Sequence, residues 1–395
     1  MAIRPNNSSS KNVEVTFVCL DDGKGMYHYA LNLASAMSAI VPSSLVLFSD
    51  SNKFGVSSKD LPVLILKNPE NNLQGKIKEK YNPTYYRNNA KKVIEQFRPR
   101  LIHITSDIIG ILSLAKTISE SDIKVLYTVH DPLPHEENTT RWHKIVQAYR
   151  TRFQMPRLIN ILDAVHVHSE RHKQILTSSF GDGISDKIYV IPHGGGITPS
   201  VRDGQRVPPE LLALKGGEEY VVLFFGQIHP YKGLECLIEA ITILRAKQIS
   251  LKLLIAGEGH LEADKYRHLG NDCVVINRFI DDSEISAIVK AAGVVVLPYV
   301  SATQSGVIPL AYAFRKPVIC SKVGALDEMV VDGETGMLVP PADADSLAAA
   351  ILELRDKSKR NEMGRKGERF LEDRISWRKV AERHHQKYQT LVTRS

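Results

Sequence analysis

Short apolar runs rich in β-branched residues recur along this chain, and segments with helical spacing separate them. The first series comprises VEVTFVCL from Val13, SLVLFS from Ser44, LIHIT from Leu101, KVLYTVH from Lys124, AVHVHS from Ala164 and KIYVIPHG from Lys187. Nearly continuous apolar runs are typical of strands buried on both faces, and intervening helices indicate right-handed crossovers in a parallel sheet. One such helix is predicted from the stripe Tyr86, Ala90, Val93 and Phe97, which ends before Pro99.

A second series of the same kind follows a stretch rich in Gly, Pro and charge after Gly194, which reads as a linker between domains. Its runs are YVVLFFG from Tyr220, LKLLIAG from Leu251, CVVINRF from Cys273, GVVVLPY from Gly293, PVICS from Pro317 and TGMLVP from Thr335. We therefore predict an α/β protein of two doubly wound domains, 1–198 and 199–375, with a ligand cleft between their strand ends. We expect a final helix over 376–395 to pack back on the first domain.

The bulk properties narrow the class of protein. A chain of 395 residues with 43% hydrophobic content is long enough for two cores. Its four cysteines are far apart and unpaired in spacing, and neither a signal peptide nor a bilayer-spanning run is evident, so we expect a cytoplasmic protein. A net charge of +7 suits polyphosphate ligands or an anionic membrane surface. Nucleic acid is not expected as a partner, because the chain has none of the usual recognition motifs.

Three motifs in the second half, FFGQIHPYKGLECLIEA from Phe224, LLIAGEGHL from Leu253 and SGVIPLAYAFRKPVICSKVGALDEMV from Ser305, carry a family resemblance. In order and spacing they resemble those of the family-four retaining glycosyltransferases of the GT-B fold. The resemblance is strongest over roughly residues 160–375. It implies two Rossmann-like domains, a nucleotide-sugar donor bound mainly by the second, an acceptor bound by the first, and transfer with retained anomeric configuration.

The resemblance assigns a phosphate-binding role to Lys232, as a point charge near the leaving group. The alternative is a surface lysine that caps a loop. The usual family arginine after the strand glycine is replaced by Gln227, which brings no charge, and His229 could supply a donor or cation instead. We place Lys232 among the catalytic residues and the other two among the donor-binding residues.

The paired glutamates of the family, eight positions apart, are also replaced. Alignment on Pro309 and Ala313 puts Gln304 and Tyr312 at their places, so these neutral side chains would contact the donor sugar and the ribose. Thr303 is included with the donor-binding residues. The amides of Ser305, Gly306 and Val307 would point towards phosphate at a helix start, unless this turn begins a helix without a ligand.

The first domain contributes two candidates. Gly25 lies between the first strand and a helix predicted to begin near Met26, where glycine lets the backbone approach a ligand or simply forms a tight turn. His130 ends the run KVLYTVH, and the matching family histidine contacts the transferring sugar. We place His130 with Lys232 among the catalytic residues; the alternative is a strand-end histidine with a structural role.

Two further residues complete the predicted donor site. Glu258 and Ile280 follow strands of the second domain, where the resemblance implies nucleotide recognition, Ile280 through its backbone. No metal-ligand spacing is evident, and we predict no catalytic metal and no cofactor.

The segment Arg141–Phe153 has an apolar stripe surrounded by basic residues. Such a helix either buries its stripe in the core or docks on anionic lipid, which would bring the enzyme to a lipid-linked acceptor at the cytoplasmic face of the membrane.

The leading hypothesis is a metal-independent hexosyltransferase of polysaccharide or cell-envelope assembly, with a glycan or lipid-linked acceptor. The replaced residues keep open a catalytically silent nucleotide-sugar-binding protein. A nucleotide-sugar epimerase fits less well, because it would need carboxylates for elimination.

Overall fold

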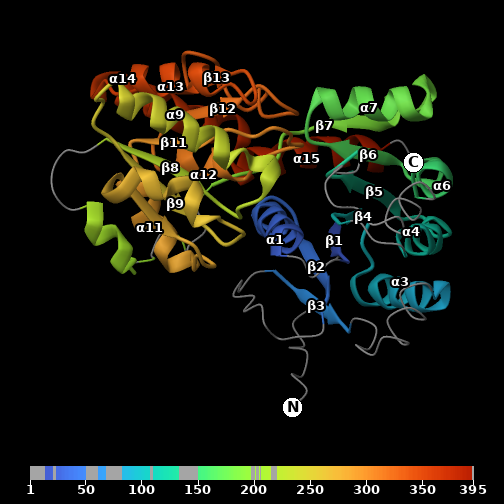
Figure 1. Ribbon diagram of the computed structural model, residues 1–395. Coiled ribbons are helices and arrows are strands. Elements are labelled where there is room, and N and C mark those ends of the chain that lie inside the picture. The colour runs from blue at the N-terminus through green and yellow to red at the C-terminus, as the bar shows by residue number, and fades with distance from the viewer. Residues whose placement is uncertain are drawn as a thin grey trace. The chain divides into compact units, whose positions relative to one another are not determined.

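The computed structural model describes residues 14–20, 24–49, 61–67, 82–106, 110–132, 150–196, 201, 204, 206–214 and 220–393 (Figure 1). The chain divides into two compact units. One comprises Met1–Pro192 and Val380–Ser395, and the other comprises His193–Lys379. The chain therefore changes unit at His193, within the predicted KIYVIPHG run, and returns to the first unit for its last segment.

The first unit is built on a seven-stranded parallel sheet of order β3-β2-β1-β4-β5-β6-β7. The strands are β1 (Val15–Cys19), β2 (Ser43–Phe48), β3 (Val63–Leu66), β4 (Leu101–Ile104), β5 (Lys124–Val129), β6 (Ala164–Val167) and β7 (Ile188–Val190). The helices include α1 (Lys24–Ser38), α3 (Pro83–Phe97), α4 (Ile111–Ser119), α6 (Met155–Ile161) and α7 (Glu170–Phe180). All six predicted strands are confirmed. The prediction missed β3, an edge strand of four residues in which Ile65 is 46% exposed.

Helix α3 illustrates how the sequence sets an element. The Asn82 side chain accepts a hydrogen bond from the backbone N–H of Thr84, and Pro83 occupies the first turn, where its missing N–H costs nothing. The predicted stripe is the buried face, and the helix ends at Arg98 in a left-handed conformation just before Pro99. The helical period of the sequence therefore identified the side that faces the sheet.

The second unit is built on a six-stranded parallel sheet of order β10-β9-β8-β11-β12-β13. Its strands are β8 (Val221–Phe225), β9 (Lys252–Ala256), β10 (Cys273–Ile276), β11 (Val294–Leu297), β12 (Val318–Ser321) and β13 (Gly336–Val339). Its helices are α9 (Leu234–Ala246), α10 (Ala263–Tyr266), α11 (Asp282–Ala291), α12 (Val307–Ala313), α13 (Ala344–Glu353) and α14 (Lys357–Phe370). Separate apolar clusters on α9 with α13, and on α11 with α12, bury the two faces of the sheet.

In both sheets the strand order reverses beside the first strand, which is the doubly wound topology predicted from the sequence. Ligands of such sheets bind at the carboxyl ends of the strands next to this reversal. In the second unit these are the ends of β8 and β11, and they direct attention to the loops after Phe225 and Leu297.

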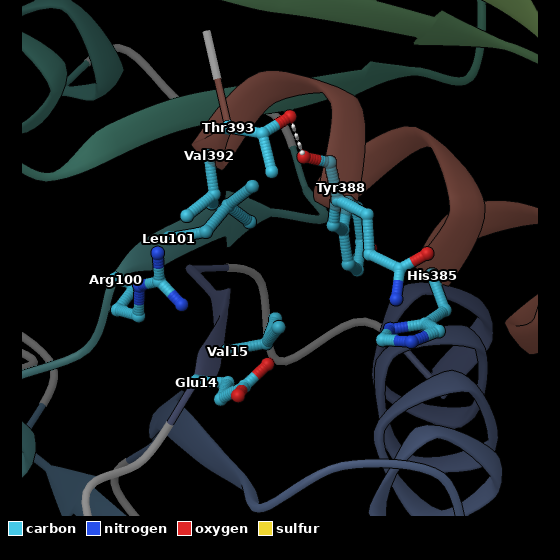
Figure 2. Close-up of a pocket in the computed structure, with 9 residues that line it drawn as sticks. Glu14, Val15, Arg100, Leu101, His385, Tyr388, Val392 and Thr393 are labelled. Carbon is cyan, nitrogen blue, oxygen red and sulfur yellow. Dashed lines mark hydrogen bonds between the residues drawn. The ribbon is translucent and has the colours of Figure 1, made fainter. Parts of the chain in front are cut away.

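The last helix, α15 (Trp377–Val392), packs in the first unit from Val380 onwards. Its buried face includes His384 and Tyr388, and the Tyr189 hydroxyl forms a hydrogen bond with His384 Nδ1 at 3.0 Å. Beyond these contacts the end of α15 and the amino ends of β1 and β4 enclose a cavity of about 230 Å³, in which Figure 2 shows Arg100 and His385. No helix in the described part of the chain has both the length and the apolar character needed to cross a bilayer.

Candidate functional site

The loops at the carboxyl edge of the second sheet are joined by backbone hydrogen bonds that continue the strand pairing. Gly226 N–H donates to Ala256 O at 2.9 Å, and Ile228 N–H donates to Glu258 O at 2.8 Å. Gly257 has φ +149°, and a Cβ added there would lie 2.0 Å from the carbonyl oxygen of Gly226. Close backbone approach therefore requires glycine at 257, and the positive φ of +110° favours glycine at 226.

Lys232 ends a short turn, Pro230–Lys232, that enters α9. Its backbone N–H donates to His229 O at 3.0 Å. The turn closes at Gly233, which has φ +64° and whose added Cβ would lie 2.0 Å from the carbonyl oxygen of Pro298. This packing fixes the turn after β8 against the end of β11, the two strands that flank the reversal of strand order.

The Lys232 ammonium lies over the sheet edge. A Cβ added at Gly226 would be 3.1 Å from Nζ, and the rings of Tyr299 and Tyr231 lie 5.6 and 6.0 Å from it. Burial lowers the pKa of Lys232 to about 8. Among the described residues no carboxylate pairs with Nζ. A desolvated cation without a counter-charge is suited to an incoming anion.

Tyr299 was not among the predicted site residues, although its place two residues after the end of β11 was a usable signal. Burial raises the pKa of its hydroxyl, and a hydrogen bond with Ser305 opposes that shift. Tyr299 therefore links the Lys232 environment to the loop that precedes α12.

Gln227 and His229 are both exposed. The His229 ring stacks on the Tyr231 ring at a centroid distance of 5.8 Å and an interplanar angle of 18°. Both side chains are accessible to a ligand at this edge. Neither makes the position as positive as the family arginine would.

The loop 301–306 lies beside the Lys232 turn, because Val300 N–H donates to Tyr231 O at 2.8 Å. Thr303 and Gln304 are half-buried, and Gln304 Oε1 is enclosed without a hydrogen-bond partner in the described structure. Ser305 Oγ accepts from Val307 N–H at 3.2 Å, and Gly306 is exposed at the start of α12. These four residues therefore lie in one loop, as predicted, and Gln304 has an unused acceptor.

Tyr312 does not belong to this loop. It is fully buried, its hydroxyl donates to Met329 O at 3.2 Å, and it pairs with Thr335 Oγ1 at 2.7 Å. The side chain is closed to a ligand, so the interpretation that Tyr312 contacts ribose is wrong. The position has become part of the core.

Glu258 is exposed and holds its loop through its carbonyl, while the Ile280 side chain is 8% exposed and packs in the core. The Asn277 side chain forms two hydrogen bonds with the backbone of Gly259. Its Oδ1 accepts from Gly259 N–H at 3.1 Å, and its Nδ2 donates to Gly259 O at 3.2 Å. Next to Ile280, Phe279 is 54% exposed and presents an aromatic ring that the sequence analysis did not single out.

In the first unit, Gly25 lies in the first turn of α1, which begins two residues earlier than predicted. His130 directly follows β5 and is 5% exposed. Its Nε2–H donates to Thr105 O at 2.8 Å, and its Nδ1 accepts from His168 Nε2 at 3.0 Å. Burial lowers the pKa of His130, whereas the bond to Thr105 and the charge of Asp131 act in the opposite direction. Both ring nitrogens are occupied, so a sugar contact through the ring requires release of one bond.

A buried chain of polar groups runs behind His130 across three strands to α15. The Tyr388 hydroxyl bonds His103 Nδ1 at 2.7 Å, His103 Nε2 bonds Thr128 Oγ1 at 2.6 Å, and Thr128 Oγ1 bonds His166 Nδ1 at 2.9 Å. His166 Nε2–H ends the chain on Ile191 O at 2.8 Å. When His103 and His166 are neutral, each of their ring nitrogens either donates or accepts one hydrogen bond, and all the donors and acceptors of this histidine chain match. We assign it a structural role.

In the described ranges no group of three His, Cys, Asp or Glu side chains could hold a metal ion. Most of the predicted helix Arg141–Phe153 lies outside the described residues. Within it, Phe153 is 46% exposed.

Comparisons with known proteins cover both halves of the chain. The family model "Glycosyltransferase Family 4" matches residues 10–194, and "Glycosyl transferases group 1" matches residues 219–357. D-inositol 3-phosphate glycosyltransferase of Corynebacterium glutamicum (strain R) is 30% identical over 210 residues, 49% of this chain and 50% of that protein. MMP alpha-(1->4)-mannosyltransferase of Mycolicibacterium hassiacum is 26% identical over 305 residues, 72% of this chain and 69% of that protein. The matched region thus spans about half the length of the first relative.

Among solved structures, that of Anabaena Alr3699/HepE in complex with UDP superposes with a TM-score of 0.71 at 17% identity, covering 96% of this chain and 100% of that chain. At this identity the likeness concerns the fold.

Proposed function

The chain belongs to the group 1, family-four glycosyltransferases and has their GT-B fold, and on that basis we propose that it is a retaining hexosyltransferase. It would use a nucleoside diphosphate sugar as donor and a separate lipid-linked or polysaccharide hydroxyl as acceptor. The related proteins named above, by their names, transfer sugars, and the UDP complex of the Anabaena protein supports a nucleotide ligand for this fold.

The observation that carries the proposal is the environment of Lys232. In transfer, the bond between the anomeric carbon and the diphosphate oxygen breaks, and the acceptor hydroxyl oxygen bonds to that carbon. The departing diphosphate gains negative charge, and its oxygen can take the acceptor's proton. An unpaired ammonium enclosed at the sheet edge stabilises that charge more strongly than an exposed one would. We expect the amides of loop 301–306 and the Gln304 oxygen to make the phosphate and sugar contacts.

We infer that transfer proceeds without a glycosyl-enzyme and without a metal. The two positions aligned with the family glutamates are Gln304, a neutral amide, and Tyr312, which is buried. A glycosyl-enzyme trapped with a slow donor and detected by mass spectrometry would overturn the first inference. Loss of activity with chelator and recovery with magnesium or manganese would overturn the second.

A catalytically silent nucleotide-sugar-binding protein is the second candidate. It is favoured by the absence of charge at Gln227 and by the bonds that occupy both nitrogens of His130. Such a protein would bind the donor without consuming it, so binding and turnover must be measured separately.

The test is calorimetric titration with a panel of nucleoside diphosphates, followed by nucleotide release from the matching sugar donors. We expect one base to bind, Lys232→Ala to weaken its Kd about 10- to 100-fold, and slow donor hydrolysis to accompany binding. The matched control is Lys247→Ala, an exposed lysine at the far end of α9, with less than a twofold effect. Binding without hydrolysis or transfer to any acceptor would favour the silent protein, and no binding at all would refute both candidates.

A further inference from the structure

A second cavity, of about 560 Å³, lies at the amino edge of the second sheet, opposite to the edge that carries Lys232. Tyr220, Gly293 and Pro317 line it, and these residues directly precede β8, β11 and β12. The remaining lining comes from Ser250 before β9, from the end of α11 and the residue after it, from the segments that follow α12 and α13, and from the first turns of α14. The cavity is therefore separate from the proposed donor site and made of different segments.

The lining of this cavity is strongly basic. It includes five cationic side chains and no aspartate or glutamate; the cationic residues are Arg315, Lys316, Arg355, Lys357 and Arg360. A concave site with one sign of charge focuses its field and concentrates ions of the opposite sign.

Two of the cations are held in place by the ends of helices. Lys316 Nζ donates to Lys290 O at 2.9 Å and to Ala292 O at 2.6 Å, at the end of α11. Arg360 Nη1 donates to Leu354 O at 2.7 Å and to Arg355 O at 2.6 Å, at the end of α13. These bonds fix both groups at the cavity without neutralising them, because a helix end supplies only partial charge.

The wall behind Arg360 is closely packed. Its guanidinium lies 4.5 Å from the centroid of the Tyr220 ring, and the Tyr220 hydroxyl donates to Ile351 O at 3.0 Å. A Cβ added at Gly293 would lie 3.0 Å from the Tyr220 ring and 3.3 Å from Arg360 Nε. Glycine at 293 therefore keeps this part of the cavity open.

The bonds to helix ends involve only some of the five cationic side chains that line the cavity. Arg315 pairs with Glu368 at 2.7 Å, but in the contacts of the described residues the Arg355 guanidinium has no hydrogen bond and no ion pair. Burial lowers the pKa of Lys316, and the nearby charge of Arg360 lowers it further. An anion in the cavity would relieve this repulsion and would meet donors already in position.

We propose that this cavity is a second anion site, which binds a phosphate-bearing ligand between Arg355, Arg360 and Lys316. Guanidinium groups bind phosphate oxygens in pairs, and the volume is in the range of small-molecule sites. The phosphate could belong to a soluble metabolite or to a lipid head group, and the experiment separates these sources.

The first arm is calorimetric titration of the full chain with inorganic pyrophosphate at low salt. We expect Arg355→Glu to weaken the Kd by tenfold or more and Arg365→Glu, the same charge change at an exposed residue farther along α14, to alter it less than twofold. We expect the Lys232→Ala variant, in which the donor site lacks its cation, to bind pyrophosphate as tightly as the parent chain does. This comparison separates failure of this inference from failure of the proposed function.

The second arm is cosedimentation with vesicles of phosphatidylglycerol and phosphatidylcholine. Pyrophosphate binding without cosedimentation assigns a soluble ligand, and cosedimentation that Arg355→Glu abolishes and Arg365→Glu preserves assigns a lipid phosphate. If Arg355→Glu does not fold, both arms are repeated with Lys357→Glu, a substitution of another residue that lines the cavity. The inference is overturned if neither probe binds, or if the variants inside and outside the cavity behave alike.

Discussion

Acidification should weaken the first unit through its buried histidines. Burial holds the pKa of His103 well below its ordinary value, and the neighbouring His166 and His130 rings lower it further. Burial likewise holds the pKa of His384 well below its ordinary value, with His166, His103 and Arg383 adding to the effect. Both rings are neutral in the folded chain but take up protons in the unfolded chain as the pH falls below about 6.5.

The sign and size follow from proton linkage. Because the unfolded chain binds more protons, the stabilising contribution is complete above pH of about 6.5 and is lost as the pH falls towards the lower folded-state pKa. Each histidine that stays neutral on folding changes the free energy of unfolding by about 1.4 kcal/mol per pH unit below that point. Two such histidines amount to about 2.5 kcal/mol between roughly pH 7 and pH 5.5.

The assay is urea denaturation followed by circular dichroism over this pH range. His384→Gln removes one titrating ring and should reduce the slope of unfolding free energy against pH by about a quarter to a half, because burial also lowers the pKa values of His130 and His172. His260→Gln is the matched control, because the His260 side chain is 88% exposed, and it should leave the slope unchanged. A flat profile for the parent chain, or the same slope in His384→Gln, would refute the assignment of neutral buried histidines.

Three further predictions concern residues of the second unit. Affinity for a nucleoside diphosphate should fall above about pH 8, by up to about tenfold per pH unit, because the pKa of Lys232 without ligand is about 8 and a bound phosphate raises it. Calorimetry across pH 7 to 9.5 tests this, and a pH-independent Kd would contradict a contact between Lys232 and the phosphate. Gly257→Ala should cost about 2 kcal/mol or more in thermal melting, since its Cβ meets the Gly226 carbonyl, whereas Gly183→Ala, with open space around it, should be nearly neutral. Tyr312→Phe should lose about 1–2 kcal/mol of stability and leave nucleotide affinity unchanged; a weakened Kd would mean that the hydroxyl reaches the ligand after all.

The strands of both sheets could be predicted from the sequence because doubly buried parallel strands are almost wholly apolar. The one missed strand, β3, lies at an edge and exposes Ile65, so its four residues carry a weaker signal. The position of Lys232 was also predictable, because a short turn after a strand end places its residues at the carboxyl edge of the sheet.

Tertiary pairing was not predictable in the same way. The bond between His103 and Tyr388 joins residues 285 positions apart, and no local pattern reports it. For the same reason the sequence could not distinguish a Tyr312 that faces a ligand from one that bonds the Met329 carbonyl in the core. Alignment gives the place of a residue along the chain, and only the fold gives its exposure.

The return of α15 to the first unit has a consequence for how the chain is made. A ribosome synthesises the whole of His193–Lys379 before Val380 and the residues after it, at about 5–20 residues per second. During that interval, roughly 10–40 seconds, the sheet side that later binds His384 and Tyr388 has no partner. The nascent first domain thus remains incomplete while the second can already fold, so the domain that begins synthesis first is the last to be finished.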